Sequence, residues 1–252
     1  MHAVLVLLLL AAASSALAAC SLADVKGAWS LQMEGEMPGK IKGHKGVSQL
    51  TSRFLGRFVL DGKGGVTAVS VRIIQLNGGN KFSMALDTYT ASNGSYSVDA
   101  SLCQYTVSWG SGNQVVGILD AAKADMDAFY SGVLMSGRFE RMPSVACTQS
   151  SIAGRKTFES SFLVQPGADN RMVKHAYIGQ ETFAVVNGLG TCTGYEIVTP
   201  DVHVIAFNST YNVSSTCEMQ DSFGYHHNLL ASGGAWYISM RDDNFDFGPL
   251  DV

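Results

Sequence analysis

The feature that most constrains the fold is a series of four landmarks that occurs twice along the chain. Each series has a cysteine followed seven residues later by a glycine, then a glycine-rich turn, an Asn-x-Ser/Thr-Tyr segment and a second cysteine. The landmarks are Cys20–Gly27, Leu60–Gly65, Asn93–Tyr96 and Cys103 in the first series, and Cys147–Gly154, Val186–Gly190, Asn208–Tyr211 and Cys217 in the second. They keep one order, at offsets of 127, 126, 115 and 114 residues. The sequence therefore predicts two divergent copies of one folding unit.

The repeat also predicts how the cysteines pair. Cys20 corresponds to Cys147 and Cys103 to Cys217, which leaves Cys192 as the odd one of five. The economical arrangement is one disulfide per copy, Cys20–Cys103 and Cys147–Cys217, while cross-pairing between the copies stays open. Each bridge would close a loop of roughly 70–85 residues, worth about 4 kcal/mol of chain entropy. Cys192 is then a small buried residue, the interpretation we favour, or a free thiol capable of an intermolecular bridge.

The N-terminal segment predicts export. Val4–Ala13 is an unbroken apolar run, too short to span a bilayer but of the right length for the core of a signal peptide. Small residues follow, so residues 1–19 are the expected signal peptide of a secreted protein. Leu17–Cys20 also resembles a bacterial lipobox, which would anchor the chain through Cys20, but a disulfide at Cys20 would exclude the lipid. Three sequons predict exposed glycosylation sites if the host is a eukaryote: Asn93, Asn208 and Asn212.

Local patterns within each copy favour antiparallel strands separated by glycine turns. Segments rich in β-branched and aromatic residues are Phe54–Leu60, Val66–Leu76, Ser95–Val98, Tyr105–Trp109, Val133–Phe139 and Val202–Phe207. We therefore expect an all-β protein with two tandem antiparallel β-barrel-like (calycin-like) units. The expected boundaries are 20–142 for the first unit, 143–146 for a linker, 147–243 for the second unit and 244–252 for a tail.

Two segments fit this pattern less directly. Leu119–Tyr130 would suit either a helix or a polar turn between strands, and Gly35–Gly46 is expected to be a long loop particular to the first copy. The larger aromatic residues are expected in the cores, where packing is the simplest explanation for them: Trp29, Trp109, Trp236, Tyr89, Tyr96, Tyr130 and Tyr211.

The first copy resembles a family of small secreted β-rich repeats, found mainly in exported bacterial proteins of unassigned function. The resemblance rests on Val25-Lys-Gly27-Ala-Trp29, the hairpin Gly56–Val66, Gly94-Ser-Tyr96-Ser-Val98 leading to Cys103, and Ser136-Gly137-Arg138. The second copy keeps its cysteines, Gly154, Gly188 and Tyr211 but loses the aromatic residue after Gly154 and the regular hairpin. The resemblance implies export and a barrel-like fold, and it supplies no catalytic residues.

Few polar patterns point to chemistry. Asp201 and His203 would share a face of a strand, a spacing that can orient a general base. With Glu196 and Arg72 they are the weak catalytic candidates. His226 and His227 are adjacent, so on a strand they point to opposite faces, and we expect a surface pair rather than a metal site.

Motif searches predict neither a metal nor a cofactor. Asp242-x-Asn244-x-Asp246 resembles the opening of a calcium loop but has Phe247 where that loop needs glycine, so we expect a solvated acidic tail and no metal. A Gly-x-Ser-x-Gly elbow, a phosphate-binding loop and a dinucleotide fingerprint are also missing, and we predict no cofactor.

These observations restrict the function classes. The formal charge of −4 and the lack of a basic run argue against nucleic acid as a partner, and no segment after the signal peptide is apolar and long enough to span a membrane. The first hypothesis is an extracellular protein that binds a small hydrophobic molecule or a partner surface. A cofactor-independent cyclase or isomerase that uses a barrel pocket is the alternative, and a structural or matrix protein is the third. The sequence leaves open the oligomeric state and whether the two units share one site.

Overall fold

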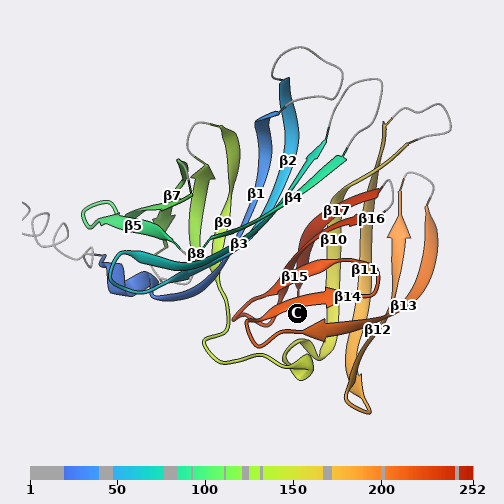
Figure 1. The fold of residues 1–252 in the computed structure, drawn as a ribbon. Helices are drawn as coiled ribbons and strands as arrows, with labels where there is room; N and C mark the ends of the chain where they lie inside the picture. The colour runs from blue at the N-terminus through green and yellow to red at the C-terminus, as the bar shows by residue number, and fades with distance from the viewer. Residues whose placement is uncertain are drawn as a thin grey trace, which may run out of the picture.

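The chain forms two β units that lie side by side and are joined by the segment 142–153 (Figure 1). The computed structural model describes residues 20–39, 48–76, 84–91, 93–110, 112–120, 125–130, 133–166, 172–199, 202–241 and 244–251. Over these ranges every regular element is a strand, apart from two short 3-10 helices, η1 (Leu22–Val25) and η2 (Gln149–Ile152). The expected all-β class with two barrel-like units is confirmed.

The first unit is a curled, nine-stranded antiparallel sheet. Its strands are β1 (Gly27–Gly39), β2 (Ser48–Leu60), β3 (Gly65–Leu76), β4 (Met84–Ala91), β5 (Gly94–Asp99), β6 (Gln104–Trp109), β7 (Asn113–Leu119), β8 (Asp125–Tyr130) and β9 (Leu134–Arg141). The order is β2-β1-β9-β8-β7-β6-β5-β3-β4, and β2 also pairs with β3. Because β4 occupies most of one edge of β3, β3 and β5 share only Gly65↔Ser95 and Val66↔Gly94.

The second unit is a closed antiparallel barrel. Its strands are β10 (Gly154–Pro166), β11 (Met172–Val186), β12 (Leu189–Val198), β13 (His203–Val213), β14 (Glu218–Asp221), β15 (His226–Leu229), β16 (Ala235–Arg241) and β17 (Asn244–Asp251). Each strand pairs with the next in the chain, and β17 returns to β10 through Thr157↔Asp251 and Phe158↔Leu250. The closure leaves no free edge strand, which protects a sheet from edge-to-edge association.

Corresponding structural details recur in the two units. Gly27 and Gly154 start β1 and β10 with φ of 125° and 117°. Tyr96 donates its hydroxyl proton to the carbonyl oxygen of Leu22 in η1, and Tyr211 does the same to Gln149 in η2, at 3.0 and 2.9 Å. The disulfides are Cys20–Cys103 and Cys147–Cys217, the pairs that the repeat predicts. Strands β4 and β5 together pair with β3 where the single strand β13 pairs with β12, so both correspond to β13.

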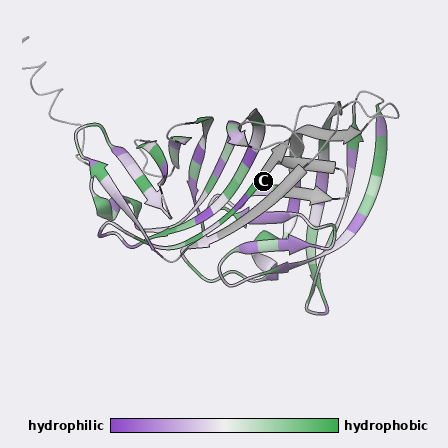
Figure 2. Cartoon of the chain, turned by 45° about the horizontal axis from the view of Figure 1, so that its top comes forward, coloured by the Kyte–Doolittle hydropathy of each residue, from purple (hydrophilic) through white to green (hydrophobic). Residues whose placement is uncertain are grey.

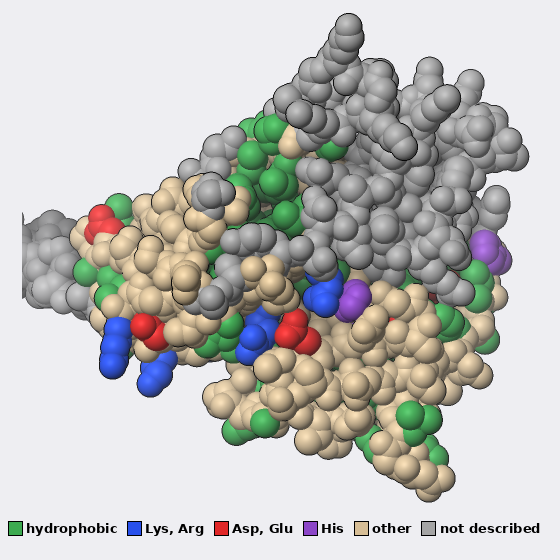
Figure 3. All heavy atoms as spheres, viewed as in Figure 1, with side chains coloured by type: hydrophobic (Ala, Val, Ile, Leu, Met, Phe, Trp, Pro, Cys, Tyr) green, Lys and Arg blue, Asp and Glu red, His purple; other side chains and the backbone are tan. Residues whose placement is uncertain are grey.

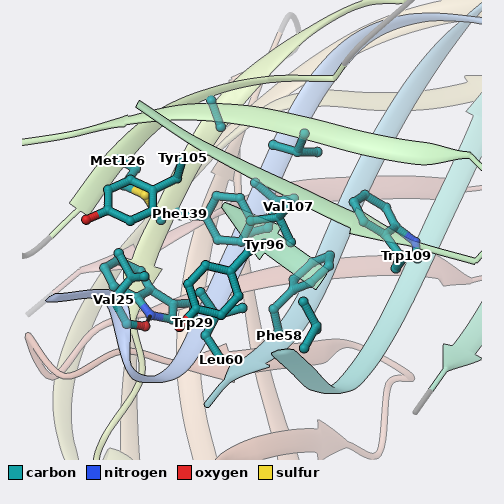
Figure 4. Packing of buried hydrophobic residues seen from close by; sticks show 14 of the residues in the cluster. Val25, Trp29, Phe58, Leu60, Tyr96, Tyr105, Val107, Trp109, Met126 and Phe139 are labelled. Atoms are coloured by element: carbon teal, nitrogen blue, oxygen red, sulfur yellow. Dashed lines mark hydrogen bonds between the residues drawn. The ribbon is translucent and has the colours of Figure 1, made fainter. Parts of the chain in front are cut away.

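Apolar and polar residues alternate along many of the strands, which turns one side of each strand toward an interior (Figure 2). In the first unit this interior is filled by a cluster of aromatic side chains (Figure 4). Phe58 makes edge-to-face contacts with Trp109 and Phe139, with ring centroids 5.0 and 5.4 Å apart. Trp29 is fully buried and donates its indole N–H to the Val25 carbonyl at 2.8 Å. The interior of the first unit is therefore a packed hydrophobic core.

The two units meet along a seam between β1–β3 and β14–β16. The buried amide of Asn228 donates from Nδ2 to Ser30 Oγ at 3.1 Å and to the Gly56 carbonyl at 3.0 Å. Arg72 Nη1 lies 3.9 Å from Glu218 Oε1. Basic, acidic and histidine side chains gather over this boundary in Figure 3. Direct hydrogen bonds of a buried side chain fix the two units against each other.

Three local expectations are corrected. The predicted tail begins with β17, whose Phe245 and Phe247 alternate with polar residues as in a strand, a pattern that the acidic side chains obscured. Asp125–Tyr130, part of the segment thought helical or a turn, is strand β8. The expected loop Gly35–Gly46 begins as strand, because β1 continues to Gly39, and its residues 40–46 lie outside the described ranges.

Candidate functional site

The second barrel contains a partly open cavity of about 280 Å³. Its lining combines aromatic and apolar side chains with three carboxylates, one imidazole and one serine. The lining residues are Phe158, Glu181, Glu196, Ile205, Phe207, Ser209, Asp221, Phe223, Tyr225, His227 and Tyr237. They come from seven strands and the β14–β15 turn, so the closed barrel as a whole positions the site. Ile205 is 39% exposed and places the mouth of the cavity near β13.

Strand register identifies what the first unit has at the same positions. Gly27 pairs with Leu60 and Gly154 with Phe183, and two residues earlier on β2 and β11 stand Phe58 and Glu181. Three more pairs of equivalent residues follow from their strand partners. The equivalent reference residues are Gly56 and Gly179, Tyr96 and Tyr211, and Tyr105 and Met219, and the residues that face them on the neighbouring strands are compared. These are Val71 with Glu196, Val107 with Asp221, and Gly117 with His227.

All four ionisable groups of the cavity thus stand at core positions of the fold. Phe58, Val71 and Val107 are each at most 2% exposed in the first unit. A carboxylate at such a position loses hydration, which costs several kcal/mol unless hydrogen bonds or a counter-charge replace the water. The second copy carries three such carboxylates around one cavity, where stability alone would favour apolar side chains. These replacements surround a common space, which makes the cavity the candidate functional site.

Asp221 and His227 form the most defined pair in the cavity. Asp221 Oδ1 accepts the backbone N–H groups of Phe223 and Tyr225, both at 2.9 Å, which fixes the carboxylate at the end of β14. Its other oxygen, Oδ2, lies 3.6 Å from Nε2 of His227. The imidazole is only 5% exposed, and neither of its nitrogens has a hydrogen-bond partner among the residues that the structure describes. A buried imidazole with its polar atoms unsatisfied is a candidate anchoring point for a ligand.

Five aromatic rings and the imidazole form two connected groups around the cavity. Phe207 contacts Phe158 and Phe223, with centroids 6.3 and 6.2 Å apart. Tyr225, His227 and Tyr237 contact one another at 5.7 to 6.2 Å. The ring faces and edges of these groups give the polar residues an apolar surrounding in which electrostatic interactions are strong.

Cys192 lies beside the cavity, and its thiol has low reactivity. It is buried, as we expected, and outside both disulfides, and its thiol donates to Glu181 Oε2 at 3.5 Å. Burial raises the pKa of the thiol, and the negative charges of Glu181 and Asp221 raise it further. The protonated thiol is a weak nucleophile, so covalent chemistry at Cys192 is disfavoured.

The residues predicted from the sequence as site candidates lie in different parts of the structure. Glu196 lines the cavity, whereas Arg72 lies at the seam beside Glu218. His203 is exposed at the start of β13, and Asp201 is outside the described residues, so their proposed pairing stays a prediction. His226 and His227 point to opposite sides of β15 as expected, but the expectation of a surface pair is wrong for His227. The sequons at Asn93, Asn208 and Asn212 all lie on exposed side chains.

Glu181, Asp221 and His227 were missed as a group because they are far apart in sequence and match no motif. The signal that could have found them is the repeat itself. Aligning the copies strand by strand would have placed the ionisable residues of the second opposite Phe58, Val71, Val107 and Gly117 of the first.

Comparisons with known proteins do not add a family to this description. No protein-family model matches the chain, and a search of curated proteins finds no significant relative. Within the described ranges, no helix combines the length and the apolar character needed to cross a membrane. No group of three or more His, Cys, Asp or Glu side chains in those ranges is arranged to hold a metal ion.

Proposed function

We propose that the protein is secreted and binds one small, largely apolar molecule inside its second barrel. The observation that carries this proposal is the replacement of core side chains by four ionisable groups around a cavity of about 280 Å³. An apolar cavity of ~150 Å³ holds a benzene molecule, so this one suits a single aromatic ring with a short side chain. The mixture of aromatic walls and a few polar groups is typical of small-molecule sites.

Export is supported by two independent features. The apolar run Val4–Ala13 has the length of a signal-peptide core, and the two disulfides are consistent with an oxidising compartment. The resemblance of the first unit to small exported β-rich repeats agrees with this assignment. The disulfide at Cys20 also argues against a lipid on that residue.

The second candidate function is a cofactor-independent isomerase or cyclase. Asp221 beside His227 is the observation in its favour, because a carboxylate that orients an imidazole is a common arrangement for moving a proton. Turnover of a ligand identified by binding would distinguish this function, since a binding protein returns the ligand unchanged.

The experiment restores two residues of the first unit in the second. In the double variant Glu181→Phe with Glu196→Val, new apolar side chains occupy the cavity, so binding of small aromatic molecules should be lost while the barrel stays folded. Saturation-transfer NMR with a panel that includes indole and 2-phenylethanol measures binding, and circular dichroism checks the fold. Thr182→Phe is the matched control, because Thr182 is the outward-facing neighbour of Glu181. No saturable binding by the unaltered protein, or equal binding by the double variant, would refute the proposal.

A further inference from the structure

His227 is a polar group of the cavity whose hydrogen bonds are left unmade. The imidazole lines the cavity and is only 5% exposed, and neither Nδ1 nor Nε2 has a hydrogen-bond partner among the residues that the structure describes. Buried polar atoms of folded proteins nearly always have such a partner, from the protein or from ordered water. A molecule in the cavity can supply the one that this side chain lacks.

The first unit shows that the fold does not require an imidazole at this position. Gly117 is the equivalent residue, and it pairs with Ala128 on β8. In the second unit the same two positions are occupied by His227 and Tyr237, and both line the cavity. Packing alone would be satisfied by apolar side chains, which carry no penalty for unmade hydrogen bonds. A ligand therefore explains the imidazole better than stability does.

Asp221 determines which nitrogen of the imidazole carries the proton. Its Oδ1 accepts the backbone N–H groups of Phe223 and Tyr225, both at 2.9 Å, and its Oδ2 lies 3.6 Å from Nε2 of His227. This separation is slightly longer than an ordinary hydrogen bond, but the charge of a carboxylate still favours the tautomer whose N–H points toward it. In that tautomer Nδ1 carries a lone pair and no proton, so it can only accept a hydrogen bond.

Aromatic rings hold the imidazole and shape the space beside it. The ring centroids of Tyr225 and Tyr237 lie 6.2 and 5.7 Å from that of His227. Phe158 and Phe207 contact each other and line the same cavity. Aromatic rings pack favourably against other rings in offset and edge-to-face arrangements. The walls therefore suit a flat aromatic molecule, and the acceptor nitrogen suits an O–H or N–H group on it.

We infer that the ligand of the second barrel is a small aromatic molecule that donates a hydrogen bond, through an O–H or N–H group, to Nδ1 of His227. The inference rests on the proposed binding function and narrows it to one class of ligand. His227 is the residue that determines specificity, and Asp221 is the residue that sets its tautomer. The barrel discriminates between ligands of one shape by whether they donate a hydrogen bond or only accept one.

Three fused-ring probes of nearly equal size test this discrimination on the full chain. Indole donates through its N–H, 1-indanone only accepts through its carbonyl oxygen, and indene does neither. Each is titrated at pH 8 by isothermal calorimetry. Indole should bind at least about tenfold more tightly than indene, because indene excludes water from Nδ1 without replacing the hydrogen bond. The carbonyl oxygen of 1-indanone would face the lone pair of Nδ1, so this probe should bind no more tightly than indene.

Two substitutions in the pair have different expected results. His227→Phe keeps a ring at this position and removes both nitrogens, so indole should lose its advantage over indene. In Asp221→Asn the amide oxygen takes over the two backbone N–H groups, which places the amide NH₂ in front of Nε2. Nε2 must then accept, and Nδ1 carries the proton. The preference should therefore reverse, from indole to 1-indanone, a change that a merely structural role of Asp221 would not produce.

A direct measurement on the imidazole supports the comparison of affinities. With ¹⁵N-labelled histidine, saturating indole should shift the Nδ1 resonance of His227, which is assigned by its loss in His227→Phe, and indene should shift it much less. Asp127→Asn is the matched control for Asp221→Asn. It alters a carboxylate of the first unit whose side chain is 83% exposed, and it should leave the order of the three probes unchanged.

The outcomes separate the inference from the binding function. Equal binding of indole and indene, or tightest binding of 1-indanone by the unaltered protein, overturns the hydrogen-bond inference and leaves the binding function standing. So does binding of other members of the NMR panel but of none of the three probes. An indole preference that survives His227→Phe overturns the role of His227, and an unchanged order in Asp221→Asn overturns that of Asp221. If neither the probes nor the panel bind, both proposals fall.

Discussion

Asn228 offers the sharpest test of how the two units depend on each other. It lies on the outer side of the second barrel, at the position that Ile118 occupies, 55% exposed, in the first unit. In the seam it is 3% exposed and donates both hydrogen bonds to the first unit. Asn228→Ala removes two hydrogen bonds of ~1 kcal/mol each and leaves a space for which neighbouring groups compensate incompletely. We expect the free energy of unfolding to fall by about 2–4 kcal/mol.

Urea denaturation followed by tryptophan fluorescence measures this change. Trp29 and Trp109 report on the first unit and Trp236 on the second, so weakened coupling should also broaden the transition or divide it in two. Asn228→Leu keeps most of the volume and loses the hydrogen bonds, which separates the two contributions. Gln220→Ala, an exposed change on the neighbouring strand, is the control. A loss below about 0.5 kcal/mol for Asn228→Ala would refute the role given to the seam.

Two further predictions concern the frame of the second unit and its pH response. Replacing Cys147 and Cys217 by serine removes a disulfide that joins residues 70 positions apart. The free energy of unfolding should fall by about 4 kcal/mol, because the unfolded chain gains entropy. A loss under ~1 kcal/mol in chemical denaturation would contradict this. Burial, with the nearby charges of Arg72 and His227, lowers the pKa of His226 to about 4. The histidine therefore binds a proton in the unfolded chain at a higher pH than in the folded one, and the free energy of unfolding should fall as pH drops from about 6.5 to 4. In His226→Asn this fall with pH should be smaller. Equal pH dependence of the two proteins in parallel urea titrations would contradict the prediction.

Much of the fold could be predicted because the constraints on it are local or repeated. A cysteine seven residues before a glycine marks the start of each unit, and the glycine adopts a positive φ that other residues rarely accept. The hairpin between β2 and β3 has the turn residues that the pattern Asp61–Gly65 requires, and Asp61 Oδ1 accepts the N–H groups of Lys63 and Gly65. The spacing from cysteine to glycine survives in both copies, whereas the regular Asp61–Gly65 turn is kept only in the first.

Strand β17 and the seam between the units could not be predicted from such local signals. The segment of β17 was misread because its acidic residues outweighed the alternation of Phe245 and Phe247. Asn228 is a polar residue in a short strand, and only the contact with Ser30 and Gly56 makes it a buried one. Contacts between units are set by shape after folding, and a single sequence carries little trace of them.

The candidate site was predictable only in part, because its chemistry depends on which strands become neighbours. Glu196 was named among four candidates, but Asp221 and His227 acquire meaning only when the barrel brings them to 3.6 Å. His227 was expected on the surface because adjacent residues of a strand point to opposite faces, so the two histidines cannot easily bind one metal. The closed barrel instead turns His226 toward the seam and His227 toward the cavity.

The hydrogen bonds of Asn228 have a consequence for how such a chain can carry a destabilising interior. A tethered neighbour is always present at a high effective concentration, whatever the concentration of the protein. The first unit, with its filled core, is therefore always in place against the second, and the coupling free energy across the seam offsets part of the cost of the carboxylates around the cavity.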